Sequence, residues 1–292
     1  MILLTGATGN VGSALLRRLT ADGQRVRCLV RDPRRLGPER VRVQISLGDL
    51  SDPGSFRNAM RGVKTVIHLA AAIRDQPRGS IEELNGVATY RLVRAAERAG
   101  AERFVYFSAM GASLHAPMRF FRAKALAEQA VDGSSVPSTI FAPSIVYSPH
   151  DYWVGLMERL TWLPAVPISG SGSAPYQPIW AEDVVDCVMA ALARGTDACG
   201  RYELAGPETL TYDDVARAVL HSLRRRRRLV HVPLPIVHSS LKAVQAVMGA
   251  ASPATWDEVE LMEARMTTPR GTEDAQALGV NPLPIREVLG VR

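Results

Sequence analysis

Three glycines near the start of the chain have the spacing that a phosphate-binding turn requires. Gly6, Gly9 and Gly12 follow the apolar run of residues 1–4, and an amphipathic segment extends from Val11 to Leu19. A sharp turn at Gly6 and a side chain reduced to hydrogen at Gly9 would let a pyrophosphate lie against the main chain. The amide groups and the positive dipole end of the following helix would then face the phosphates. The spacing therefore predicts a dinucleotide-binding turn between a strand and a helix.

The end of the next strand indicates which dinucleotide such a turn would hold. The predicted strand of residues 25–30 runs into Arg31 and Asp32, with Arg34 and Arg35 close behind. An acidic residue at this place would accept hydrogen bonds from the adenosine ribose of NAD, whereas guanidinium groups favour the 2′-phosphate of NADP. Arg31 and Arg35 therefore predict NADP(H), and Asp32 keeps NAD(H) as the alternative.

A parallel sheet is needed to bring these residues together. Apolar runs alternate with helical patterns, which predicts strands at residues 2–5, 25–30, 41–44, 65–69, 103–107 and 138–141, and helices at 11–22, 53–61, 81–99 and 118–131. Such alternation predicts an α/β fold with a doubly wound parallel sheet of the Rossmann type. Ligands bind these sheets beyond the carboxyl ends of the strands, so we expect the functional residues in the loops that follow strands.

The second half of the chain has a less regular pattern. We predict a nucleotide-binding Rossmann core over residues 1–150. The mixed segment of residues 151–292 would complete that core and form a small α/β subdomain for substrate or docking. Residues 164–178 are rich in glycine, serine and proline and are predicted as a loop. Residues 236–248 are predicted as a helix whose apolar face suits either the core or a partner.

The Thr-Gly-x-x-Gly-x-x-Gly spacing of residues 5–12 resembles that of the extended and atypical short-chain dehydrogenase/reductases, whose members include epimerase/dehydratase-like proteins. The resemblance covers most of the chain. Within this family, the chain is most similar to the branch that contains the NmrA-like proteins and the nucleotide-binding accessory subunit of respiratory complex I. Further matching motifs are Gly48-Asp49-Leu50, His68-Leu69-Ala70-Ala71, Ser108, Lys124 and Pro143-Ser144.

The resemblance implies a cofactor-binding set that extends beyond the glycine turn. Asp49 would approach the adenine amino group, the small side chains after the fourth strand would let the cofactor cross the sheet edge, and Asn85 resembles the family's helix asparagine. No metal site is expected. The full expected set is Gly6, Thr8, Gly9, Asn10, Val11, Gly12, Arg31, Arg35, Asp49, Leu50, Leu69, Ala70, Ala71, Asn85, Lys124, Pro143 and Val146.

The family's catalytic group is incomplete in this chain. Its reductases use a serine after the fifth strand, together with a tyrosine and a lysine four residues apart on one helix face. The lysine lowers the pKa of the phenol, and the tyrosine exchanges a proton with the substrate. Ser108 and Lys124 match this pattern, but Phe120 occupies the tyrosine position. A phenyl ring has no exchangeable proton.

Two functions therefore stay open. In the first, the chain is a reductase of a small carbonyl, enone or quinone-like acceptor, and its proton comes from Lys124, His115 or Tyr147. In the second, the nucleotide is retained by a non-catalytic assembly or redox-sensing protein. Ala142 stands where the family normally has arginine, and no arginine matches the one that holds a nucleotide sugar. Sugar-nucleotide epimerisation or dehydration is therefore disfavoured.

Composition bounds the class of protein and its partners. The 292 residues are 47% hydrophobic and 22% charged, which is ordinary for a globular protein. The cysteines are scattered and the first strand starts at once, so we expect a cytoplasmic protein without a signal peptide. A net charge of +6 does not indicate nucleic-acid binding, and the expected partner is a small-molecule substrate or a protein. The arginines at 224–228 are interpreted as a solvated helix end, with peripheral membrane contact as the minor alternative.

Overall fold

The computed structural model describes residues 1–149, 151–249 and 254–290. Seven parallel strands form one sheet in the order β11-β6-β5-β4-β1-β2-β3, which confirms the predicted Rossmann fold. The chain moves outward in one direction from β1 to β3 and in the other from β4 onward, so the switch point lies between β1 and β4. The strands are β1 (Ile2–Thr5), β2 (Val26–Val30), β3 (Gln44–Leu47), β4 (Thr65–His68), β5 (Arg103–Phe107), β6 (Ser138–Pro143) and β11 (Gly200–Leu204).

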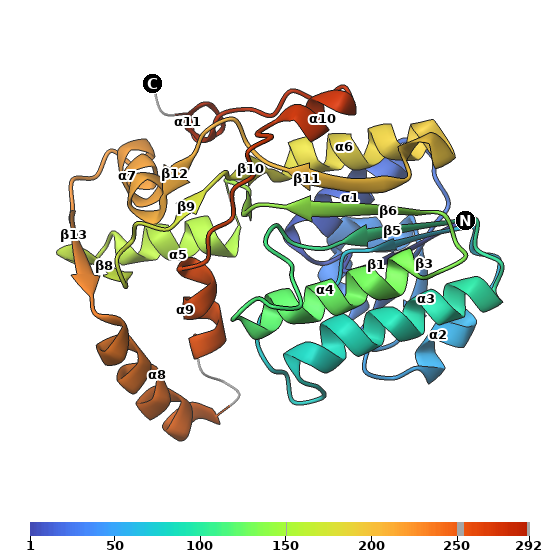
Figure 1. The fold of residues 1–292 in the computed structure, drawn as a ribbon, viewed down its shortest axis with the longest axis horizontal. Helices are drawn as coiled ribbons and strands as arrows, with labels where there is room; N and C mark the ends of the chain where they lie inside the picture. The colour runs from blue at the N-terminus through green and yellow to red at the C-terminus, as the bar shows by residue number, and fades with distance from the viewer. Residues whose placement is uncertain (150, 250–253, 291–292) are drawn as a thin grey trace.

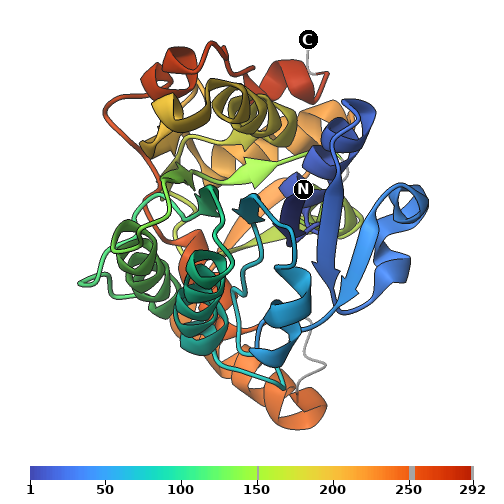
Figure 2. The same ribbon diagram turned by 90° about the vertical axis from the view of Figure 1, so that its right-hand side faces the viewer.

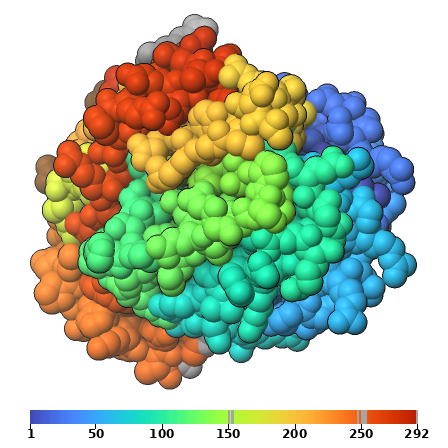
Figure 3. All heavy atoms as spheres, turned by 45° about the vertical axis from the view of Figure 1, so that its right-hand side comes forward, coloured from blue at the N-terminus to red at the C-terminus, as the bar shows by residue number. Residues whose placement is uncertain are grey.

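Helices cover both faces of this sheet, as Figures 1 and 2 show. On one face lie α1 (Asn10–Ala21) and α6 (Ala181–Arg194), and on the other lie α2 (Gly54–Ala59), α3 (Ala88–Arg98) and α4 (Arg119–Asp132). The helices α3 and α4 pack side by side, and Figure 3 shows them on the surface turned to the viewer. Two 3₁₀ segments, η1 (Pro33–Val41) and η3 (Gly195–Ala198), and one π-helical turn, η2 (Glu83–Val87), complete this part.

Side-chain alternation along the strands builds two separate cores. Successive residues of a strand point to opposite faces, so a continuous apolar run serves both. Leu4 and Val105 pack beneath α1 and α6. Their strand neighbours Leu3 and Phe104 pack beneath α2, α3 and α4. This two-sided burial fixes the sheet rigidly and therefore fixes the loops that follow its strands.

The remaining elements form a smaller region beside the carboxyl end of the sheet (Figure 1). The second half of the chain supplies this region. It also contributes β11 to the sheet and α6 to one of the layers that cover it. Residue 150, at which we placed the boundary, lies outside the described residues. Its elements are β7 (Val146–Tyr147), α5 (Tyr152–Leu160), β8 (Ala165–Ser169), β9 (Pro175–Tyr176), β10 (Ile179–Trp180), β12 (Leu210–Thr211), α7 (Tyr212–Ser222), β13 (Arg228–Val232), α8 (Leu234–Met248), α9 (Trp256–Met262) and α11 (Ile285–Val288). The short helix α10 (Glu273–Ala277) packs instead against β11, and its Ala275 belongs to the core beneath α1 and α6.

Two local predictions were wrong. The third strand begins at Gln44 instead of ending there, because Asp32 caps a 3₁₀ segment that extends to Val41. Residues 164–178 are not one loop, because they contain β8, which pairs with β13, and β9, which pairs with β12. Within the described residues, no helix combines the length and apolarity needed to cross a bilayer.

Candidate functional site

A cavity of about 620 Å³ opens beyond the carboxyl ends of β1, β2 and β4, at the switch point of the sheet. Expected residues that line it are Gly6, Thr8, Gly9, Arg31, Arg35, Asp49, Leu50, Leu69, Ala70 and Ala71. Asp32, the residue that kept NAD(H) as the alternative, also lines it. Its other lining residues, which the sequence did not single out as ligand contacts, are Thr5, Ala7, Leu29, Val30, Gly48, Ala72, Gln76 and Leu84. The cavity therefore gathers loops that are far apart in the sequence.

The glycine turn forms one wall of the cavity. Gly6 has a φ of +76°, and a Cβ there would lie 2.5 Å from the backbone nitrogen of Ala70. A Cβ on Gly12 would lie 2.0 Å from the carbonyl oxygen of Gly6, so only glycine lets α1 start this close to the turn. The N-cap residue Gly9 has no side chain, and the amides of residues 10–12 donate to no acceptor in the described part of the chain. These free amides at a helix N-terminus form an anion-binding surface.

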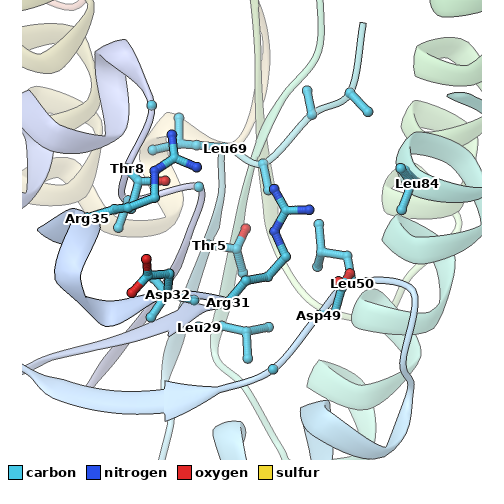
Figure 4. A pocket seen from close by; sticks show the side chains of 18 of the residues that line it. Thr5, Thr8, Leu29, Arg31, Asp32, Arg35, Asp49, Leu50, Leu69 and Leu84 are labelled. Carbon is cyan, nitrogen blue, oxygen red and sulfur yellow. The ribbon is translucent and has the colours of Figure 1, made fainter. Parts of the chain in front are cut away.

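Two arginines enter the cavity from the segment after β2 (Figure 4). Arg31 and Arg35 are both exposed to solvent. Asp32 also lines the cavity, but one of its carboxylate oxygens accepts the backbone amide of Arg34 at 3.0 Å and so caps η1. The free charge on this side of the cavity is therefore mainly positive, as an anionic ligand group would require.

Asp49 stands on the opposite side of the cavity, at the end of β3 (Figure 4). Its Oδ1 accepts the backbone amide of Ser51 at 3.0 Å. Its Oδ2 is buried and accepts no hydrogen bond from any described residue, and the nearest cation, Nη1 of Arg78, is 3.7 Å away. A buried carboxylate oxygen without a donor is costly, so this atom is suited to receive a donor from a ligand.

Four residues of the expected cofactor set serve the framework around the cavity instead of its lining. The side chain of Asn10 donates to Asp151 and accepts from Ser148 Oγ at 2.8 Å, which ties α1 to the start of α5. Asn85 donates to the carbonyl of Ala72 at 2.8 Å and accepts its amide at 3.1 Å, and so fixes the loop after β4. Val11 and Gly12 belong to the first turn of α1.

Pro143 and Val146 lie farther along the sheet, at the end of β6 and in β7, and do not line the cavity. The carbonyl of Pro143 accepts the amide of Met110 at 2.9 Å, which joins the ends of β6 and β5. Val146 packs against the core beneath α1 and α6. A ligand that contacted these two residues would have to extend beyond this cavity.

Lys124 is buried in α4 behind β5. Only 2% of its surface is exposed, and its Nζ donates to the carbonyl of Phe107 at 2.6 Å. The Nζ also lies 5.0 Å from the centre of the Tyr106 ring and 5.7 Å from that of Phe120. Burial lowers the pKa of this amine to about 7. Lys124 can therefore exist in both protonation states near neutral pH, which a proton donor or acceptor requires.

Ser108 follows β5, as expected, and is buried next to this lysine's hydrogen-bond acceptor. Its Oγ has no hydrogen-bond partner among the described residues, although its backbone amide donates to Phe141. Neither Ser108 nor Lys124 lines the cavity. Phe120 is half-buried at the edge of an apolar cluster formed by α4, α5 and the C-terminal region. The expected serine, lysine and phenyl positions thus lie around the end of β5 and the start of α4.

The other suggested proton donors are placed less favourably. Tyr147 is completely buried with Val215 and Ile285, and burial raises the pKa of its phenol. It is therefore a poor acid at neutral pH. His115 lies exposed in the loop between β5 and α4, where its amide donates to Ser113 Oγ.

A buried histidine connects the cavity wall to α3, and sequence reasoning gave it no role. His68 Nδ1 lies 2.6 Å from the hydroxyl of Thr5, and its Nε2 lies 2.9 Å from the hydroxyl of Thr89. Burial lowers the pKa of His68 to about 3, so the ring is neutral. The residue occurs in the matching motif at positions 68–71, but nothing in its local pattern indicates these two partners.

Comparisons with known proteins agree with this geometry. The model of a protein family described as NAD(P)H-binding matches residues 6–160. A (4-alkanoyl-5-oxo-2,5-dihydrofuran-3-yl)methyl phosphate reductase from Streptomyces griseus is 31% identical over 250 residues, 83% of this chain and 81% of that protein. Subunit 9 of the mitochondrial NADH dehydrogenase [ubiquinone] 1 alpha subcomplex from Arabidopsis thaliana is 30% identical over 244 residues, 79% of this chain but only 60% of that protein.

Solved structures share the fold over almost the whole chain. A nucleoside-diphosphate-sugar epimerase from Staphylococcus aureus superposes with a TM-score of 0.77 over 99% of both chains at 17% identity. At this identity the likeness concerns the arrangement of the elements alone.

Proposed function

Because the chain belongs to the NAD(P)H-binding family of atypical, epimerase-like short-chain dehydrogenase/reductases, we propose that it is an NADP(H)-dependent oxidoreductase. Its substrate would be a small, mainly apolar carbonyl, enone or quinone-like acceptor. The observation that carries the proposal is the cavity at the switch point, which is lined by the glycine turn, two arginines and an aspartate with an unpartnered carboxylate oxygen. The free amides of residues 10–12 lie directly after the glycine turn, at the start of α1.

The residues around the cavity fit a phosphorylated dinucleotide. The amides of residues 10–12 would hold the pyrophosphate. Arg31 and Arg35 would contact the 2′-phosphate, for which guanidinium groups offer charge-assisted hydrogen bonds. The unpartnered Oδ2 of Asp49 would accept the adenine amino group. When bound, the cofactor would supply or accept a hydride.

Ser108 and Lys124 would serve the substrate end of the site. The free hydroxyl of Ser108 can donate to a substrate oxygen. Lys124, with its pKa near 7, can give up or take a proton at neutral pH although position 120 offers no phenol. The apolar cluster next to Phe120 favours an apolar acceptor. A reductase relative from Streptomyces griseus supports this class of reaction.

Cofactor choice can be tested by titrating the protein with NADPH and with NADH in a fluorescence or calorimetric assay. We expect the wild type to bind NADPH more tightly, and the double variant Arg31→Ser/Arg35→Ser to lose about tenfold or more in NADPH affinity while its NADH affinity changes little. Arg34→Ser is the matched control, because Arg34 is an exposed neighbour that does not line the cavity. Equal wild-type affinities for the two nucleotides would overturn the proposed preference.

The alternative is a protein that retains the nucleotide for assembly or redox sensing. Phe120, which cannot exchange a proton, favours this function, as does the likeness to a subunit of a mitochondrial NADH dehydrogenase. A panel of carbonyls, enones and quinones separates the two proposals. Oxidation of NADPH by the wild type would refute the non-catalytic function. Tight binding without turnover by either the wild type or Phe120→Tyr would refute the reductase.

A further inference from the structure

The turn between α5 and β8 exposes two large apolar side chains. Trp162 is 76% exposed and Leu163 is 45% exposed, although both follow directly on the completely buried Thr161. Isolated apolar residues are common on protein surfaces, but an adjacent tryptophan and leucine at the tip of a turn are a concentrated apolar feature.

Arginines from the segment after α7 pack against this turn. Arg225 Nη1 donates to Thr161 Oγ1 at 2.9 Å, and its guanidinium lies 4.1 Å from the centre of the Trp162 ring. Arg227 Nε donates to the carbonyl of Thr161 at 3.1 Å. Together with Arg217, Leu220 and His221, the arginines at 225–228 line a shallow hollow of about 610 Å³. Arg225 and Arg227 are therefore held against this turn, and Arg225 lies over the indole.

This positive charge is not balanced locally. In the ranges that the structure describes, none of the arginines at 224–228 forms an ion pair with a carboxylate. Arg224 even adopts a φ of +53°, a conformation that favours glycine. The run is thus a dense cationic patch whose natural counterpart is an anionic surface.

Exposed apolar residues continue from this patch along β13 into α8. Val230 pairs with Pro167 of β8, and both are exposed, while the adjacent Val166 and Ile168 are buried. Ile236, at the start of α8, is 56% exposed, and none of the described side chains of α8 is buried. Figure 1 shows β13 leading directly into α8 at the edge of the molecule away from the sheet. Trp162, Leu163, the arginines at 225–228, Val230 and Ile236 define what we call the arginine–tryptophan face.

We propose that the arginine–tryptophan face docks on the surface of an anionic lipid bilayer. Indole rings favour the headgroup level of a membrane, where an apolar body and a polar N–H are both satisfied. Arginines beside them pair with lipid phosphates while their aliphatic stems stay against apolar atoms. Apolar side chains that project from a cationic base suit insertion into the interface plane, and each arginine near the surface adds about fivefold to membrane partitioning.

A second basic surface of the same chain has several arginines but few exposed apolar side chains. The groove between α2 and α3 contains Arg57, Arg61, Arg91, Arg94 and Arg98. Its exposed large apolar residue is a single tyrosine, Tyr90. The groove therefore offers a matched control, because reversing arginines there changes the net charge of the protein by the same amount.

The test is co-sedimentation of the full chain with vesicles of phosphatidylcholine that contain, or lack, about one third phosphatidylglycerol. We expect the wild type to bind only the anionic vesicles. Partitioning should fall about tenfold or more in Trp162→Ala/Leu163→Ser and in Arg226→Glu/Arg228→Glu, but less than about threefold in the control Arg57→Glu/Arg61→Glu. Each variant should keep the wild-type affinity for NADPH, because the arginine–tryptophan face is separate from the nucleotide cavity.

Three results would overturn the proposal. The first is a wild type that binds neither type of vesicle. The second is an equal loss of partitioning in the groove control, which would reduce the effect to net charge. The third is a concentration-dependent dimer, measured by light scattering, that Trp162→Ala dissociates, since a second copy of the chain would then cover this face.

Discussion

Replacing Lys124 with methionine should remove a pH-dependent cost to the stability of the protein. Burial lowers the pKa of this amine from 10.5 to about 7. Between these two values the unfolded chain binds a proton that the folded chain does not, so the stability of the wild type rises with pH across this window. The penalty is greatest at and below about pH 7, where the ammonium is buried in the folded state, and it disappears above about pH 10.5.

The size of the effect follows from the linkage of proton binding to unfolding. A full proton difference changes the free energy of unfolding by about 1.4 kcal/mol per pH unit, and incomplete titration reduces this to about 1.2 kcal/mol. From about pH 7 to pH 9.5 the wild type should therefore gain roughly 3 kcal/mol relative to Lys124→Met. Loss of the hydrogen bond to Phe107 shifts the whole difference by about 1 kcal/mol without changing its slope.

Urea unfolding of both proteins at several pH values measures this difference directly. Subtracting the free energy of unfolding of Lys124→Met from that of the wild type at each pH removes the contribution of all other titrating groups. Lys242→Met is the matched control, because Lys242 is exposed on α8 and its replacement should leave the slope unchanged. Parallel curves for the wild type and Lys124→Met would refute the reasoning, since they would show that the amine at position 124 is charged at no cost in the folded protein.

Three further predictions concern the glycine turn, the core and the cavity. Gly12→Ala places a Cβ 2.0 Å from the carbonyl of Gly6, so thermal unfolding should show a loss of about 2 kcal/mol or more; an unchanged Tm would contradict this contact. Burial raises the pKa of Asp183 to about 6, so its carboxylate weakens the fold as the pH rises above about 4. Asp183→Asn should keep the hydrogen bond from Leu283 and add about 1–2 kcal/mol at pH 7.5 but nothing at pH 4, and equal gains at both pH values would exclude the charge as the cause. Asp49→Asn should weaken NADPH binding about tenfold in a fluorescence titration, because an amide nitrogen would oppose the adenine amino group; unchanged affinity would remove the proposed contact.

Long apolar strands and the glycine turn could be predicted because their signals are local. Both β1 and β5 occur where the apolar runs placed them, since each is buried on two faces. The edge strand β3 was misplaced because Val41, which looked like part of a strand, is 83% exposed at the end of η1. An edge strand shares only one neighbour and so needs little apolar character.

Elements that depend on distant pairing were harder to predict. β8 lies in a stretch rich in glycine, serine and proline, and it becomes a strand by pairing with β13, some 60 residues later. The same holds for parts of the cavity. Ala72, Gln76 and Leu84 all line it, and Asn85 holds the first of them through both groups of its amide. No local pattern encodes the path of that loop.

The cavity residues that directly follow strands could be predicted from the sequence, because their position depends on the sheet alone. The carboxyl ends of parallel strands meet at one edge of a sheet, so a motif after any strand can be placed there from the sequence. This argument places Arg31 and Asp49 at the cavity. It does not reveal that Lys124 turns its amine to the carbonyl of Phe107, since that orientation depends on packing between α4 and β5.

The position of β11 has a consequence for how the protein is made. Its residues, Gly200–Leu204, pair with Ser138–Pro143 of β6, and the amide of Glu203 is held by Asp274. While a ribosome synthesises the chain, the outer edge of β6 has no neighbour until residue 204 has emerged. An uncovered strand edge promotes pairing with other chains. During the interval between translation of these two strands, the nascent protein therefore exposes an unpaired edge of its central sheet.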